Sequence, residues 1–147
     1  MADHDRPLNK RGRRDGPRMG RLIATQQIVP DLILSSTAER ARQTAEAVAG
    51  VCDCGDRIEL IDSLYLADVE TIIQVLHGVA DRYETLMAVG HNPGIEQLLA
   101  ALTHADMTMP TAALAELRLN IDRWGDIAGE GGAECVHLWL PRQLEAD

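Results

Sequence analysis

Short apolar runs alternate with segments of helical periodicity along most of this 147-residue chain. The strand-like runs lie at 32–34, 58–61 and 86–89. We expect helices at about 9–27, 38–50, 69–82 and 93–102, and a terminal hairpin-like pair at 113–121 and 135–140. Strands that alternate with helices predict an α/β fold, with a mostly parallel sheet covered by helices on both faces. Because a chain of this length usually builds one core, we expect a single domain over residues 1–147.

Glycine and proline mark the expected helix ends. Pro17 falls inside the first predicted helix, where it removes a backbone hydrogen bond, so we expect a break or kink there. Gly50 is expected to end the second helix, and Pro93 is well placed as the first residue of the fourth.

Composition excludes several classes of function. The net charge is −9, although residues 1–21 carry a local excess of basic side chains, and the acidic remainder with 3% aromatic residues argues against nucleic-acid binding. No apolar run approaches the roughly 20 residues of a membrane helix. No signal peptide precedes the polar start, so we expect a cytoplasmic protein without a membrane partner. Cys52, Cys54 and Cys135 lack zinc-site spacing and are expected to be buried or idle thiols, with no metal bound.

Arg40 is the first candidate for a functional residue. The apolar run 32–34 ends in Ser35 and Ser36, and a helix then opens with Arg40 in its first turn. Helix N-termini offer unpaired N–H groups, and an arginine there adds a planar fork that grips phosphate through two hydrogen bonds. Taken alone, this segment favours a capped helix with a solvated arginine.

His91 is the second candidate, because of its place after a strand. It follows the run 86–89 and Gly90, and it precedes Asn92, Pro93 and a helix. Ligands of open α/β sheets bind beyond the carboxyl ends of the strands. Two strand–helix units would therefore bring Arg40 and His91 to one crevice, which favours a site over a plain surface histidine.

Four segments, taken in order, resemble the SixA-type phosphohistidine phosphatases of the histidine phosphatase superfamily, which includes the phosphoglycerate mutases. The segments are Asp5 to Gly12 (DRPLNKRG), Ser35 to Ala45 (SSTAERARQTA), Val89 to Gly94 (VGHNPG) and Met109 to Ala113 (MPTAA). Each segment alone is weak evidence for this resemblance, but the four in this order over nearly the whole chain are strong evidence. The resemblance implies a three-layer phosphoglycerate mutase-like fold. It also implies metal-independent phosphatase activity, without a cofactor, on a phosphohistidine-bearing protein or a small phosphate ester.

One part of the family pattern is missing. The family's first, central strand ends in Arg-His-Gly or Arg-His-Ala, whose histidine is the nucleophile, and no Arg-His pair occurs in this chain. His4 has neither a preceding arginine nor a preceding strand, so we do not assign it as the nucleophile. We expect that the polypeptide is N-terminally truncated and lacks this strand, for example through a start codon assigned too late. A natural pseudophosphatase, which binds a phosphopeptide or a metabolite without catalysis, is the alternative.

The resemblance also implies roles for the site residues. Attack by an imidazole on phosphorus gives a phosphohistidine intermediate, which water then hydrolyses. Arg40 would clamp two phosphoryl oxygens, and His91 would stabilise the charge that builds on a third. Arg6 and Asn92 would be further phosphate contacts, with a plain surface arginine as the competing interpretation of Arg6. Ser36 would add a hydroxyl or cap the helix, and capping is favoured.

The general acid is less well defined by the sequence. Asp68 lies where related enzymes carry acidic or polar groups, but a helix cap is the favoured interpretation. Tyr65 is expected in the pocket wall. His77, His104 and His137 show no pattern of partners and are expected on the surface or in the core.

We predict that the chain, expressed as written, is poorly stable and has no phosphatase activity. Loss of a central strand opens two strand edges and a slot in the core, and unpaired edges favour aggregation. Thermal unfolding and turnover of a phosphoramidate substrate test the two halves of this prediction. A soluble chain with a cooperative transition and measurable turnover contradicts both. Codons upstream of Met1 that encode an in-frame strand ending in Arg-His would support the phosphatase hypothesis. A stop codon there would support the hypothesis of a non-catalytic binder.

Overall fold

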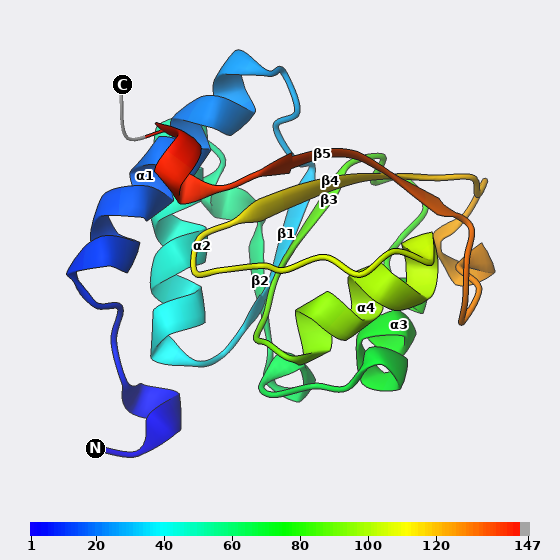
Figure 1. Cartoon of the computed structure of the whole chain (residues 1–147), viewed down its shortest axis with the longest axis horizontal. Coiled ribbons are helices and arrows are strands. Elements are labelled where there is room, and N and C mark those ends of the chain that lie inside the picture. The colour runs from blue at the N-terminus through cyan, green and yellow to red at the C-terminus, as the bar shows by residue number, and fades with distance from the viewer. Residues whose placement is uncertain (145–147) are drawn as a thin grey trace.

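A computed structural model describes residues 1–144, in which two groups of strands lie among four α-helices (Figure 1). The main elements, in order, are α1 (Lys10–Thr25), β1 (Leu32–Ser36), α2 (Glu39–Cys52), β2 (Ile58–Ile61), α3 (Val69–His77), β3 (Leu86–Val89), α4 (Gly94–Thr103), β4 (Leu114–Leu119) and β5 (Ala133–Trp139). Short 3-10 turns lie between them, including Asp3–Asp5 before α1 and Asp62–Leu64 after β2.

The first group of strands is a parallel sheet in the order β2-β1-β3. Leu34 of β1 lies opposite Glu59 of β2 on one side and Ala88 of β3 on the other. β4 and β5 form an antiparallel pair, with an irregularity between Glu116 and Leu117. The expected α/β architecture, with a mostly parallel sheet and a terminal strand pair, is confirmed.

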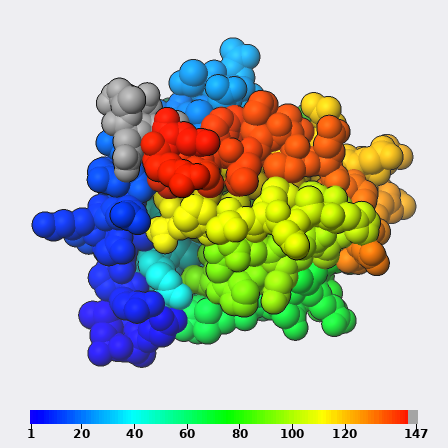
Figure 2. Space-filling model, viewed as in Figure 1, coloured from blue at the N-terminus to red at the C-terminus, as the bar shows by residue number. Residues whose placement is uncertain are grey.

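β1 lies at the centre of the core, and all five of its residues are buried. Leu32 and Leu34 belong to an apolar cluster with residues of α3 and α4, whereas Ile33 packs against Ala45 and Ala49 of α2. Alternate residues of a strand face opposite sides of a sheet. Helices therefore cover both faces, α1 and α2 on one side and α3 and α4 on the other (Figure 1). Figure 2 shows β5, the segment 104–113 and α4 as one continuous layer on the viewed face.

Two predictions for the first half of the chain, a helix break at Pro17 and a helix end at Gly50, are wrong. α1 continues through Pro17 without a break, held by its buried face (Met19 and Ile23 among others), which packs beside α2. α2 continues past Gly50 to Cys52 and ends at Asp53, which adopts the left-handed backbone conformation with φ 58°. Aspartate tolerates this conformation better than most residues, so Gly50 is not needed as the terminator.

The later helices also differ from the prediction in their bounds. α3 ends at His77 rather than near Arg82, because the N–H of Gly78 turns back to bond the carbonyl of Val75 and a turn follows. α4 begins at Gly94, so Pro93 is the residue before the helix rather than its first residue.

α1 and α2 approach each other closely at Gly20. A Cβ atom at this position would lie 2.9 Å from the Cβ of Val51 and 3.0 Å from the backbone oxygen of Val48. The backbone oxygen belongs to α2 and cannot rotate away as a side chain would. A side chain at residue 20 would therefore push the two helices apart.

We predict that Gly20→Ala lowers the free energy of unfolding by about 1–3 kcal/mol, the usual effect of overpacking. Gly50→Ala is the matched control, because a Cβ there meets no atom within 4 Å. It should raise the free energy of unfolding by about 0.5–1 kcal/mol through helix propensity. Urea unfolding measures both, and equal effects of the two substitutions would contradict the close helix contact.

Candidate functional site

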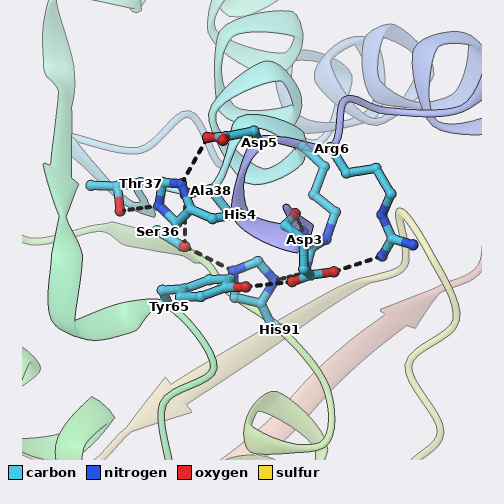
Figure 3. A network of polar contacts seen from close by, with 10 residues as sticks. Asp3, His4, Asp5, Arg6, Ser36, Thr37, Ala38, Tyr65 and His91 are labelled. Atoms are coloured by element: carbon cyan, nitrogen blue, oxygen red, sulfur yellow. Dashed lines mark hydrogen bonds and ion pairs between the residues drawn. The ribbon is translucent and has the colours of Figure 1, made fainter. Parts of the chain in front are cut away.

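The carboxyl ends of the three parallel strands meet at one edge and carry the candidate site. Ser36 is the last residue of β1, Tyr65 follows β2 through the turn Asp62–Leu64, and His91 lies two residues after β3. Arg40 lies in the first turn of α2, directly beyond β1. Parallel strands place such residues side by side, and Figure 3 shows Ser36, Tyr65 and His91 close together. The predicted proximity of Arg40 and His91 is confirmed by a contact of 3.4 Å between Arg40 Nη2 and His91 Nδ1.

The carboxylate of Asp3 lies at the centre of the positive charge in this site. Arg6 donates to Asp3 Oδ1 at 2.9 Å, and Arg40 donates to Oδ2 at 3.2 Å and to the Asp3 backbone oxygen at 2.9 Å. The hydroxyl of Tyr65 also donates to Oδ2 (Figure 3). This hydrogen bond first, and then the guanidinium of Arg40, hold the pKa of Asp3 below its ordinary value. The site is therefore built to hold an anion, and Asp3 supplies one.

His91 is held as a neutral imidazole with a defined tautomer. Burial first, and the neighbouring guanidinium of Arg40 second, lower the pKa of His91 below its ordinary value. Arg40 can only donate, so Nδ1 of His91 accepts. The proton then lies on Nε2, which donates to the hydroxyl oxygen of Ser36 at 2.8 Å. The site thus contains an N–H donor that does not need to be charged.

His4 enters the site from the N-terminal turn, but both of its ring nitrogens face protein groups. Nε2 lies 2.9 Å from the hydroxyl of Thr37, and Nδ1 lies 3.5 Å from Asp5 Oδ1. The ring packs edge-on against Tyr65 with a centroid distance of 4.8 Å, and His91 packs against the same tyrosine at 5.5 Å. Neither nitrogen of His4 is aimed at the carboxylate that Arg40 holds.

Ser36 does not cap α2 in the predicted way. Its hydroxyl accepts from the N–H of Ala38 at 3.2 Å, but the helix begins only at Glu39, and no side chain caps it. This hydrogen bond lies in the loop between β1 and α2. The oxygen of the same hydroxyl also accepts from Nε2 of His91.

Asn92 and Asp68 have positions that favour structural roles. Asn92 donates to the carbonyl of Met109 at 2.7 Å and accepts from the N–H of Glu96, so it ties the 109–113 loop to α4. Asp68 caps α3 by accepting from the N–H of Thr71 at 2.9 Å, as the favoured interpretation predicts. The same hydrogen bond lowers the pKa of Asp68, which does not favour a proton donor.

Sequence reasoning missed Asp3 and the polar role of Tyr65. Tyr65 follows a strand, so the rule that pointed to His91 could have found its hydroxyl as well. No local pattern distinguishes Asp3, since it reaches Arg40 across 37 positions of sequence.

The described part of the chain contains no cluster of candidate metal ligands. Among residues 1–144, no group of three or more histidine, cysteine or acidic side chains is arranged to hold a metal ion.

None of the helices in this part of the chain is long and apolar enough to cross a membrane. Cys54 is buried, and burial raises the pKa of Cys52 to about 11, so that thiol is unreactive.

Comparison of sequences relates the chain to phosphatases. The profile of the histidine phosphatase superfamily (branch 1) matches residues 1–65, which include Arg6, Ser36, Arg40 and Tyr65. An uncharacterised protein of Mycobacterium tuberculosis is 35% identical over 153 residues, which cover 97% of this chain and 93% of that protein. A chloroplast protein of Arabidopsis thaliana is 30% identical over 96% of this chain and 70% of its own length.

Solved structures show the same fold. A structure from Nakamurella multipartita, named for the phosphohistidine phosphatase SixA, has a TM-score of 0.85 at 27% identity and covers 96% of this chain and 88% of that one. Its counterpart from Agrobacterium tumefaciens has a TM-score of 0.77 at 30% identity, over 96% and 87%. The protein histidine phosphatase SixA complexed with tungstate has a TM-score of 0.79 at 23% identity, over 99% and 90%. The expected phosphoglycerate mutase-like fold is confirmed.

We predict that Asp3→Asn raises the affinity of the site for sulfate by roughly three- to tenfold, because the competing carboxylate charge is lost. Asp5→Asn removes the same charge from the same turn without a contact to Arg40, and it should leave the affinity nearly unchanged. Sulfate keeps its charge between pH 5 and 8, so calorimetric titration reports the site alone. Equal effects of the two substitutions would show that general charge, not displacement of Asp3, governs binding.

Proposed function

The chain belongs to the histidine phosphatase superfamily, and on this basis we propose that its site binds the phosphoryl group of a phosphohistidine, with Arg40 as the main clamp. The observation that carries this proposal is the convergence of Arg40, Arg6 and Tyr65 on the single carboxylate of Asp3. A carboxylate and a phosphoryl group both present charged oxygens to such donors. We infer that the phosphoryl group takes the place of Asp3.

The donors are suited to a tetrahedral anion. The planar fork of Arg40 already makes two bonds to Asp3, one to the side chain and one to the backbone oxygen, and would bind two phosphoryl oxygens. Tyr65 would donate to one of these oxygens, and Arg6 would bind from the solvent side. His91 would turn its Nε2–H from Ser36 to the third oxygen. A nearby phosphoryl charge raises the pKa of His91, so binding should be accompanied by proton uptake.

A phosphorylated histidine suits this site better than a phosphate ester does. An alkoxide leaving group needs a proton donor, and Asp68, the candidate acid, is an ionised helix cap. The imidazole of phosphohistidine is a better leaving group and needs less proton assistance. The side chain of Arg6 is 64% exposed, so the outer wall of the site is open to a phosphoryl group that projects from another protein. We therefore propose a phosphorylated protein as the substrate.

We further propose that this chain binds phosphoryl groups but does not turn them over by itself. The sequence contains no Arg-His pair, and both nitrogens of His4 contact other groups. In the mechanism that the family implies, an imidazole attacks phosphorus and breaks its bond to the leaving nitrogen, and water then hydrolyses the phosphohistidine formed. Arg40, Arg6 and His91 would stabilise the transferred group, and the contacts of His4 with Thr37 and Asp5 leave the attacking imidazole unassigned. A non-catalytic phosphopeptide binder is the alternative, and it shares the same binding groups.

We predict that the chain binds tungstate, a phosphate-like oxyanion, and that Arg40→Ala weakens this binding roughly 100-fold, as expected for the loss of two charged hydrogen bonds. Arg40→Lys should restore part of the affinity, since it keeps the charge without the fork. Arg42→Ala is the matched control, because Arg42 lies in the same helix but pairs with Glu39 and Glu46. Isothermal titration calorimetry measures all four proteins.

A phosphoramidate assay on the same samples tests the absence of a nucleophile. We expect no turnover above the uncatalysed rate for the chain or any variant. Turnover that is lost in His4→Gln would identify His4 as the nucleophile and contradict that part of the proposal. Failure of the wild-type chain to bind tungstate would contradict the phosphoryl site itself.

A further inference from the structure

Leu66 has an unusual backbone conformation at the edge of the candidate site. It follows Tyr65, whose φ is −67° and ψ 116°, and its own φ is 51°. The N–H of Ala67 bonds the carbonyl of Leu64 at 3.4 Å across this turn. These are the features of a type II turn, whose third position requires a positive φ and is usually glycine or asparagine. Leucine is strained there, because in the left-handed conformation its Cβ crowds the following carbonyl oxygen.

The surrounding contacts account for the turn but not for the leucine. The turn carries Tyr65, whose hydroxyl bonds Asp3, and leads into Asp68, which caps α3. Its backbone also packs directly on α4, since a Cβ on Gly94 would lie 2.1 Å from the carbonyl oxygen of Ala67. Glycine or asparagine at position 66 would allow all of these contacts. Burial offsets little of the strain, because the leucine is 58% exposed.

A groove of about 140 Å³ lies beside this leucine. Its apolar lining consists of Leu66, Ala67, Pro93 and Gly94. A space of this size accommodates one aliphatic side chain, since cavities of about 150 Å³ hold a benzene molecule. The groove is therefore suited to a single apolar side chain, with Leu66 as part of its wall.

The groove adjoins the candidate site through both of its walls. One wall, which begins at Leu66, follows directly from Tyr65, and the other, residues 92–94, follows directly from His91. The rings of Tyr65 and His91 lie 5.5 Å apart between centroids, and Figure 3 shows them side by side. One residue of an extended peptide spans about 3.3 Å. The groove is thus within reach of a side chain about two residues from a phosphohistidine bound at Arg40.

We propose that Leu66 and the groove beside it form a specificity subsite, which binds an apolar side chain of the phosphorylated protein close to its phosphohistidine. This inference rests on the proposed function and adds to it a preference for apolar residues around the modified histidine. Strained backbone is typical of binding sites, where it persists because the surrounding structure fixes it. Leucine at position 66 supplies an apolar contact that glycine and asparagine lack.

Two peptides that carry a triazole phosphonate in place of phosphohistidine test the subsite on the full chain. In one peptide, leucine stands two residues before and two residues after the analogue, and in the other peptide serine replaces both leucines. The phosphonate resists hydrolysis, so calorimetric titration measures binding alone. We expect the leucine peptide to bind roughly five- to tenfold more tightly than the serine peptide, as partial burial of one leucine implies.

Leu66→Asn should abolish this preference and leave tungstate binding unchanged. Because asparagine adopts the left-handed conformation more readily than leucine, the melting temperature of the variant should equal or exceed that of the wild type. Leu60→Asn is the matched control, since Leu60 is also exposed, at 45%, but lies in β2 and does not line the groove. It should keep the peptide preference and lower the melting temperature, because asparagine is disfavoured in strands.

Four outcomes would overturn the subsite. Equal affinity of the wild type for the two peptides, in a chain that binds tungstate, would overturn it and leave the phosphoryl site standing. A preference that survives in Leu66→Asn would show that another surface binds the leucine. A melting temperature of Leu66→Asn below that of the wild type would show that Leu66 serves the fold. Failure of tungstate and of both peptides to bind would overturn the proposed function and this inference together.

Discussion

The parallel pairing of β1 with a strand on each side is the interaction on which the rest of the structure depends. Its register places Ser36 opposite Ile61 of β2 and Ser35 opposite Val89 of β3, so all three strands end at one edge. A slip of one residue would turn the side chains of β1 to the opposite face. The buried alternation of Leu32, Ile33 and Leu34 against two helix layers prevents such a slip. The site is therefore positioned by the core.

The positive charge gathered at this edge gives the site its chemistry. Arg40 is only 23% exposed in its side chain and lies within hydrogen-bonding distance of His91, whose pKa is lowered by burial first and by this guanidinium second. The carboxylate of Asp3, in the N-terminal turn, balances the charge of Arg40. It accepts hydrogen bonds from both Arg40 and Tyr65. In this structure the anion site is thus occupied by the carboxylate of Asp3, whose side chain is 44% exposed. Under the proposed function, a phosphoryl group takes the place of this carboxylate.

The same sheet explains why a second feature lies beside the first. β3 ends the parallel group and β4 begins the antiparallel pair, with a cavity between them that reaches Arg40 and His91. The edges of β3 and β4 border this cavity, and Arg40 and His91 of the anion site line it at the carboxyl end of β3. The anion site and the cavity are therefore neighbouring features of one sheet edge.

The sequence by itself determined the α/β class, the strands at 58–61 and 86–89, and the meeting of Arg40 and His91, because periodicity and the strand-end rule are local or topological properties. Only the tertiary structure decided the partners of these groups. Asp3 reaches Arg40 across 37 positions, and Tyr65 joins it from a different strand unit. Packing beside α2 kept α1 continuous through Pro17, against its local propensity. Through-space contacts of this kind depend on how elements pack, and no spacing along the chain encodes them.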